Sequence, residues 1–300
     1  MKFIRTLKPE FIDTLNELYE NKKSWWRTIV DDQDVFILLR NNQLRAQVSG
    51  GLLLEISYNA KRKLICKMSD LFLTLHSGTV RYVEIDETTT APTQQIEGLR
   101  GLVRHYAKVK ARIKNFTGRE KQVVQHLANN ITQVVDFEVG FEGKVKDGGK
   151  QKSVPRIDMA AITDGGTLVF FEVKLFENSE IRAKETETPK VAGQLLKYEK
   201  LLAQYGRDIV AGYKEQLHVY SQLEGKFFKS RVRDFAEIDL YPQARLIITG
   251  FDGPQRDIML PVVRKGIVKG YTWQNEKDDL IATGNHQSLT KSRRLFLGLK

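Results

Sequence analysis

The spacing of apolar residues changes from a helical to a strand period within the first third of the chain. After Pro9, apolar side chains recur every three or four residues as far as Tyr19. This pattern predicts an amphipathic helix with proline in its first turn, where the missing N–H costs least. Beyond it, short apolar runs separated by Asn, Gly and Lys turns predict an antiparallel meander. The runs cover residues 35–39, 44–48, 52–58 and 64–68, followed by a short helix around 69–76 and a strand over 79–85.

A stretch without hydrophobic period separates this region from the rest of the chain. Residues 86–93 are typical of a linker. Residues 95–114 then predict one long helix with Leu99, Leu102, Val109 and Ile113 on its apolar side. We therefore expect an α+β accessory module over residues 1–90, a linker and helix over 91–116, and a second domain over 117–300.

The second half alternates helices and strands. Helices are predicted over 118–130 and 191–205, and strands over 134–141, 154–163, 168–175 and 246–249. The nearly continuous apolar run at 168–175 is typical of a central strand covered on both faces. Residues 206–242 predict a mixed insertion. The expected fold class is α/β, with a mixed sheet flanked by helices.

Charged side chains interrupt two of these apolar strands. Glu172 and Lys174 share one face of their strand because alternate residues of a strand point the same way. If that strand pairs with the preceding one through the turn at 164–166, Asp158 lies beside them. Two carboxylates suit Mg²⁺, for which Mn²⁺ substitutes, and a neighbouring ammonium can stabilise charge on a phosphate. A bound metal would lower the pKa of Lys174 and the carboxylates would raise it, so the sign stays open.

These residues resemble the signature of the PD-(D/E)xK nuclease superfamily. Pro155 and Asp158 stand on the first strand, and thirteen residues separate Asp158 from the Glu172-Val-Lys174 segment. Gln194 and Tyr198, four residues apart on a predicted helix, resemble the Q-x-x-x-Y element of the RecB-type branch. The order of elements over residues 117–250 also resembles the core of that fold. The chain departs from the motif in one respect, because two residues separate Pro155 from Asp158.

The resemblance implies a restriction-endonuclease-like domain that hydrolyses phosphodiester bonds in DNA with Mg²⁺. Lys174 would position the attacking water, and the family helix would line the site. The residues implicated as catalytic are Asp158, Glu172, Lys174, Gln194 and Tyr198, and those implicated as metal ligands are Glu120, Asp158, Glu172 and the backbone carbonyl of Val173.

Two of these assignments have structural alternatives. Glu120 stands three residues after Thr117, a capping-box spacing that would account for it without a metal. On the later helix, Gln194 would be merely solvated if the apolar stripe consists of Leu195, Tyr198 and Leu202.

Net charge favours a polyanionic partner. The 300 residues include 48 Lys and Arg against 37 Asp and Glu, a net charge of +11. Among polyanionic partners, this charge favours a nucleic acid. Three basic segments are candidate contacts: a stripe of basic residues at every fourth position of the helix over 95–114, the basic turn 61–63 and the Gly/Lys-rich loop 144–152. The pair Trp25–Trp26 could stack on bases. The stripe consists of Arg100, Arg104, Lys108 and Arg112. A solvated helix face and a small core are the alternatives for the stripe and the Trp pair.

Other classes of site are not indicated. The single cysteine, Cys66, excludes an internal disulfide, the histidines lack zinc-ligand spacing, and neither a P-loop nor a nucleophile elbow occurs. No apolar run reaches about 18 residues and no signal-peptide core is present, so we expect a cytoplasmic protein without a membrane partner. DNA or RNA, a homodimer, a non-cleaving DNA-binding scaffold and a nuclease gated by a protein partner of the N-terminal module all stay open.

Overall fold

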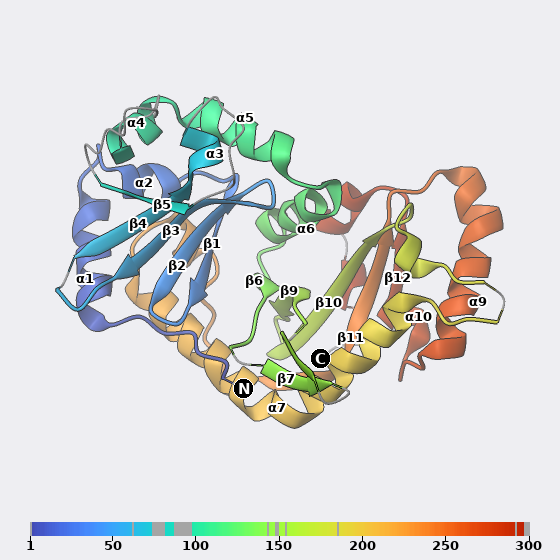
Figure 1. Ribbon diagram of the computed structural model, residues 1–300. Helices are drawn as coiled ribbons and strands as arrows, with labels where there is room; N and C mark the ends of the chain where they lie inside the picture. The colour runs from blue at the N-terminus through green and yellow to red at the C-terminus, as the bar shows by residue number, and fades with distance from the viewer. Residues whose placement is uncertain are drawn as a thin grey trace. The chain divides into compact units, whose positions relative to one another are not determined.

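The computed structural model (Figure 1) describes residues 2–61, 63–73, 82–86, 98–142, 144–147, 150–153, 155–184, 186–291 and 293–296. The chain forms two compact units. The meander unit consists of Ile4–Asn129 and Gly212–Asp234, and the mixed-sheet unit consists of Met1–Phe3, Asn130–Ala211 and Phe235–Lys300. Most of the linker predicted over 86–93, and Arg62 of the predicted basic turn, lie outside the described residues.

An antiparallel five-stranded sheet forms the centre of the meander unit. Its strands follow the chain order, and each pairs with the next. Asn42 takes a φ of 48° in the tight turn between the first two strands, a left-handed conformation that Asn tolerates well. The predicted antiparallel meander is therefore confirmed. The strands are β1 (Val35–Arg40), β2 (Gln43–Val48), β3 (Gly51–Tyr58), β4 (Leu64–Ser69) and β5 (Tyr82–Ile85).

Helices complete the meander unit. The predicted helix after Pro9 is α1, which buries Phe11, Ile12 and Leu15. The single helix expected over 95–114 is instead two helices, because the backbone at His105 (φ −107°, ψ 20°) is not helical. The basic stripe is thus divided between two helices. The helices are α1 (Pro9–Glu20), α2 (Trp25–Val30), α3 (Asp70–Leu73), α4 (Gly98–Arg104), α5 (Tyr106–Phe116), α6 (Arg119–Asn130) and α8 (Lys226–Lys229).

The tryptophan pair belongs to the core of the meander unit. Trp25 and Trp26 are 5% and 0% exposed. The ring of Trp26 lies 6.1 Å from that of Phe228 on α8, centroid to centroid. The expectation that this pair stacks on bases is therefore wrong, because its faces are already covered by apolar side chains.

A mixed five-stranded sheet forms the centre of the other unit, in the order β12-β11-β10-β9-β6 (Figure 1). β10 lies antiparallel to β9 and parallel to β11, and every residue from Leu168 to Leu175 is buried. The prediction of a central strand covered on both faces is confirmed. The strands are β6 (Val134–Val139), β9 (Ile157–Ile162), β10 (Thr167–Leu175), β11 (Asp239–Thr249) and β12 (Leu280–Thr283).

Helices and one hairpin connect these strands. The predicted Gly/Lys-rich loop forms the hairpin of β7 (Lys144–Asp147) and β8 (Lys150–Ser153), inserted between β6 and β9. The helix expected over 191–205 is α7 (Lys190–Gln222), so part of the expected insertion is a continuation of that helix. None of the helices in the described part of the chain is both long and apolar enough to cross a membrane. The remaining elements are η1 (Ser179–Ile181), the π-helical turn η2 (Gln255–Met259), α9 (Leu260–Gly270), α10 (Glu276–Asp279), η3 (His286–Lys291) and η4 (Arg293–Phe296).

The boundaries between the units differ from those predicted at residues 90 and 116. Helices α4 and α5 and most of α6 belong to the meander unit, where α5 packs on β2 and β3. Residues 212–234 return to the same unit, and the Tyr220 hydroxyl there donates a hydrogen bond to the Ile37 carbonyl of β1 (2.9 Å). The buried faces of α4 and α5 explain why residues 98–116 belong to the meander unit rather than to a separate connecting segment.

Candidate active site

A tight turn and the strand pairing after it bring Asp158 beside the central strand. Gly166, in the turn between β9 and β10, has a φ of 85°, and a Cβ there would lie 2.8 Å from the carbonyl oxygen of Glu237. The pairing continues to Phe171 opposite Met159. Immediately beyond it, the Val173 amide N–H donates a 2.8 Å hydrogen bond to Oδ2 of Asp158. Asp158 and the Glu172–Lys174 segment are therefore adjacent.

Lys174 lies between two carboxylates. Its Nζ is 2.8 Å from Oε1 of Glu172 and 2.8 Å from Oε2 of Glu180. The side chains of Lys174 and Glu172 are 6% and 2% exposed, whereas Glu180 is about one-third exposed. Such a pair is stable in a protein interior only when its charges are well satisfied. Here both charges have partners.

Glu180 is a site residue that the sequence reasoning missed. It lies on η1, directly after β10, and the Asn178 side chain accepts a hydrogen bond from its backbone N–H (2.9 Å). An Asn that caps the turn after a central strand is the available local signal. That signal fixes the turn but does not indicate that Glu180 reaches back to Lys174.

The carboxylates decide the sign of the pKa shift of Lys174. Burial by itself would lower this pKa, but the charges and hydrogen bonds of Glu172 and Glu180 outweigh burial and raise the pKa above its ordinary value. Lys174 is therefore an ammonium at neutral pH. In this arrangement it is a positive charge that lies within hydrogen-bonding distance of two carboxylates.

Tyr198, from α7, also contacts Glu172. Its hydroxyl lies 2.9 Å from Oε2 of Glu172 and 2.8 Å from the carbonyl oxygen of Arg156. The single hydroxyl hydrogen is donated to one of these acceptors at a time. Burial, followed by the negative charge of Glu172, raises the pKa of Tyr198, so the phenol stays protonated. Tyr198 is both a core residue and a neighbour of the site.

Gln194 lies one helical turn before Tyr198 and is partly buried. Its Oε1 atom is buried and has no hydrogen-bond partner within the described residues. The alternative is confirmed in part: Leu195, Tyr198 and Leu202 are all buried and form the apolar stripe, but Gln194 is not simply solvated, because its Oε1 is buried. A buried acceptor without a donor is unusual enough in proteins to require a reason.

Glu120 belongs to the meander unit, whereas the other candidate residues belong to the mixed-sheet unit. Helix α6 begins at Arg119, so Gly118 rather than Thr117 precedes its first residue, and Glu120 is the second. Thr117 instead follows α5, where its hydroxyl donates to the Ile113 carbonyl (2.8 Å). A capping box would need Thr117 directly before the first residue of the helix, and Gly118 occupies that position. The capping-box alternative is therefore wrong. The metal role of Glu120 stays a prediction.

The oxygen atoms around Asp158 fit a hard cation in their chemistry. Asp158 and Glu172 supply carboxylates, and the Val173 backbone lies beside Asp158 through its N–H. The N–H and C=O of one strand residue point to the same side, which places the Val173 carbonyl on the Asp158 side. Mg²⁺ commonly takes one or two carboxylates and keeps several waters. Within the described ranges, no group of three or more His, Cys, Asp or Glu side chains is arranged to hold a metal.

Comparison of the chain with protein-family models, curated proteins and solved structures found no match.

Proposed function

We propose that the protein is a metal-dependent nuclease of the PD-(D/E)xK type and that the mixed-sheet unit carries its active site. One observation carries the proposal. Asp158, Glu172 and Lys174, which the signature requires together, lie on adjacent central strands, and Lys174 and Glu172 are buried in direct contact. A central strand rarely holds buried charges without a chemical use for them, because desolvation of the ions is costly.

The order of the elements supports this proposal. Helix α6 precedes β6, the Asp158 strand β9, the Lys174 strand β10, helix α7 and the parallel strand β11. This is the order expected from the resemblance. Tyr198 of the Q-x-x-x-Y helix contacts Glu172, as an element that lines the site would.

Mg²⁺ would be held by Asp158, Glu172 and the Val173 carbonyl. A bound Mg²⁺ supplies a Lewis acid and lowers the pKa of a coordinated water. Lys174, as an ammonium, would bind and orient a scissile phosphate and offset the charge that develops on it. Tyr198 would hold the Glu172 carboxylate in place through its hydrogen bond. Gln194, whose Oε1 has no partner among the described residues, would accept a hydrogen bond from water or substrate.

DNA is the proposed substrate, and a protein partner or second copy bound through the meander unit is the proposed regulator. The net charge of +11 supports a polyanion. The β7–β8 hairpin, with lysines at four of its eight strand positions, directly precedes the Asp158 strand and is a candidate for phosphate contacts.

The test is cleavage of circular and linear DNA with Mg²⁺ or Mn²⁺. Lys174→Met keeps an apolar stem of similar length, Asp158→Asn keeps the shape of its side chain, and Lys200→Ala removes an exposed lysine of α7 as the matched charge control. Each variant is checked for folding by thermal unfolding. We expect cleavage to be lost in the first two variants and retained in the third.

Equal cleavage by all three variants would refute the site. Folded wild-type protein that binds DNA but cleaves none would favour the non-cleaving scaffold. Cleavage that begins only when a partner is added would favour gating through the meander unit. The same assay with RNA substrates tests the remaining choice of nucleic acid.

A further inference from the structure

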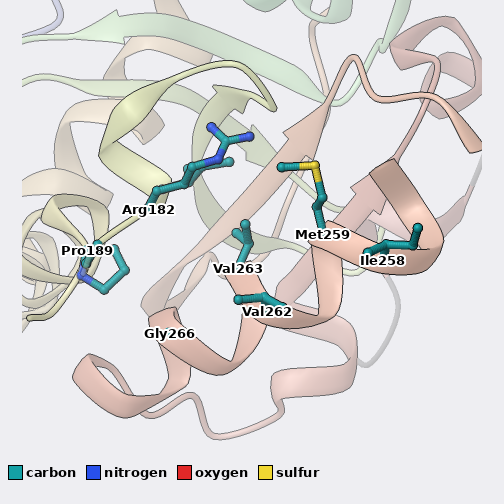
Figure 2. Close-up of a pocket in the computed structure, with 9 residues that line it drawn as sticks. Arg182, Pro189, Ile258, Met259, Val262, Val263 and Gly266 are labelled. Atoms are coloured by element: carbon teal, nitrogen blue, oxygen red, sulfur yellow. The ribbon is translucent and has the colours of Figure 1, made fainter. Parts of the chain in front are cut away.

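An open apolar pocket lies in the mixed-sheet unit beside the segment that follows β10. Its volume is about 330 Å³. The connection from β10 to α7 forms one wall, with Arg182 and Pro189, and η2 with α9 forms the other, with Ile258, Met259 and Val262 (Figure 2).

The wall formed by η2 and α9 is unusually apolar for an exposed surface. Ile258 and Val262 are 71% and 70% exposed, and Met259 is 44% exposed. Exposed apolar patches rimmed by polar groups mark binding sites more often than chance. Met259 adds a side chain that adapts to flat ligands, and π-helical turns such as η2 recur at functional sites.

The opposite wall is continuous with the candidate active site. Glu180 contacts Lys174, and Arg182, only two residues further along, lines the pocket. Consecutive Cα atoms are about 3.8 Å apart, so the Cα atoms of Glu180 and Arg182 are separated by no more than about 7.6 Å. One short segment of chain thus contacts Lys174 through Glu180 and lines the pocket through Arg182.

Arg182 gives the pocket a positive charge in a fixed position. Its guanidinium lies 4.7 Å from the centre of the Phe176 ring and donates a 3.2 Å hydrogen bond to the Asn178 carbonyl. The pocket thus combines apolar walls with one cation at its edge. A nucleobase matches this combination, because it has an apolar face, a polar edge and a phosphate attached through its sugar.

We propose that this pocket binds an unstacked nucleobase of the DNA strand whose phosphate lies at Lys174. The inference rests on the proposed nuclease function and adds a requirement for an unpaired base next to the cleaved bond. Ile258, Met259 and Val262 would contact the face of the base, and Arg182 its edge or the adjoining phosphate.

Two fluorescein-labelled single strands of equal length test the inference, one with normal bases and one with abasic sites throughout its centre. Binding is followed by fluorescence anisotropy in Ca²⁺ without Mg²⁺. The test variant is Ile258→Ser/Val262→Ser, which removes exposed apolar side chains only. The matched control is Leu196→Ser, on α7 outside the pocket and 42% exposed.

We expect the double variant to bind the normal strand at least about five-fold more weakly, because the base would no longer cover the apolar surface of two side chains. Its affinity for the abasic strand should equal that of the wild type, because the phosphate contacts are unchanged. Leu196→Ser should match the wild type on both strands. The affinity for a fully paired duplex should be the same in the wild type and the double variant, because no base is free to enter the pocket.

Equal affinity of the wild type and the double variant for the normal strand would overturn the inference while leaving the nuclease proposal intact. An equal loss on both strands would also overturn it, since the pocket would then act on the backbone or the fold. Failure of the wild type to bind either strand would overturn the inference together with the proposed DNA substrate.

Discussion

The hydroxyl of Tyr198 offers the sharpest test of the geometry at the candidate site. The Tyr198→Phe substitution keeps the buried ring and removes only the group that lies between Oε2 of Glu172 and the carbonyl oxygen of Arg156. The Glu172 carboxylate and the Arg156 carbonyl both stay in place, and one of them loses the hydroxyl that donated to it. Glu172 is almost completely buried, so water cannot easily replace the lost partner.

The expected loss follows from this burial. A hydrogen bond to a charged group contributes about 1.5–3 kcal/mol, and an orphaned buried acceptor costs a similar amount. We therefore expect the free energy of unfolding of the Tyr198→Phe variant to fall by about 2 kcal/mol. For a domain of about 150 residues this corresponds to a fall in Tm of about 4–8 °C.

Tyr205→Phe is the matched control. Tyr205 lies two turns further along α7, is half-buried, and its hydroxyl has no hydrogen-bond partner within the part of the chain that is described. This control should change the free energy of unfolding by less than about 0.5 kcal/mol. Thermal and denaturant unfolding of both variants are measured beside the wild type. Equal stability of the two variants would refute the hydrogen bond from Tyr198 to Glu172.

Three further predictions concern stability. Because the pKa of Lys174 is raised in the folded state, its ionic contacts stabilise the protein below the ordinary lysine pKa of 10.5, and this contribution is lost as the pH rises through the folded value. Unfolding measured from pH 8 upwards should therefore show an alkaline loss of stability that is smaller in Lys174→Met; identical profiles would contradict the raised pKa. Arg245 and Asp279 form a buried ion pair with a 3.0 Å contact, so Arg245→Met should cost about 3–5 kcal/mol by leaving the carboxylate without its cation, and the double variant with Asp279→Asn should recover part of the loss. A double variant no more stable than Arg245→Met would argue against the ion pair between Arg245 and Asp279. Trp26→Ala should destabilise the meander unit by about 3–5 kcal/mol because Trp26 is fully buried, whereas an unchanged Tm with weaker DNA binding would restore the base-stacking role.

Local sequence determined the strands and the meeting of the charged residues. Alternation with a period of two sets which residues share a strand face, and the short turn with Gly166 fixes β9 against β10. Those two features suffice to place Asp158 beside Glu172 and Lys174. The antiparallel meander follows from the same rules. Short turns join β1 to β2 and β2 to β3, and strands joined in this way pair with their neighbours in the order of the chain.

Contacts between distant segments were decided only by the tertiary structure. Residues 212–234 return to the meander unit, and Trp26 is buried against Phe228 across some two hundred residues. Local periodicity indicates which face of an element is buried but not what covers it. The predicted unit boundaries and the base-stacking role of the tryptophans were wrong for this reason.

The electrostatic character of the site was likewise a tertiary property. The sequence left the sign of the Lys174 pKa shift open, and in the structure the carboxylates of Glu172 and, to a smaller extent, Glu180 raise this pKa against the lowering effect of burial. Tyr198 was predicted either as a core residue or as a site residue, and its hydroxyl on a buried carboxylate makes it both. Charge and burial act through space, so the same residues acquire their chemistry only once the fold brings their partners within hydrogen-bonding distance.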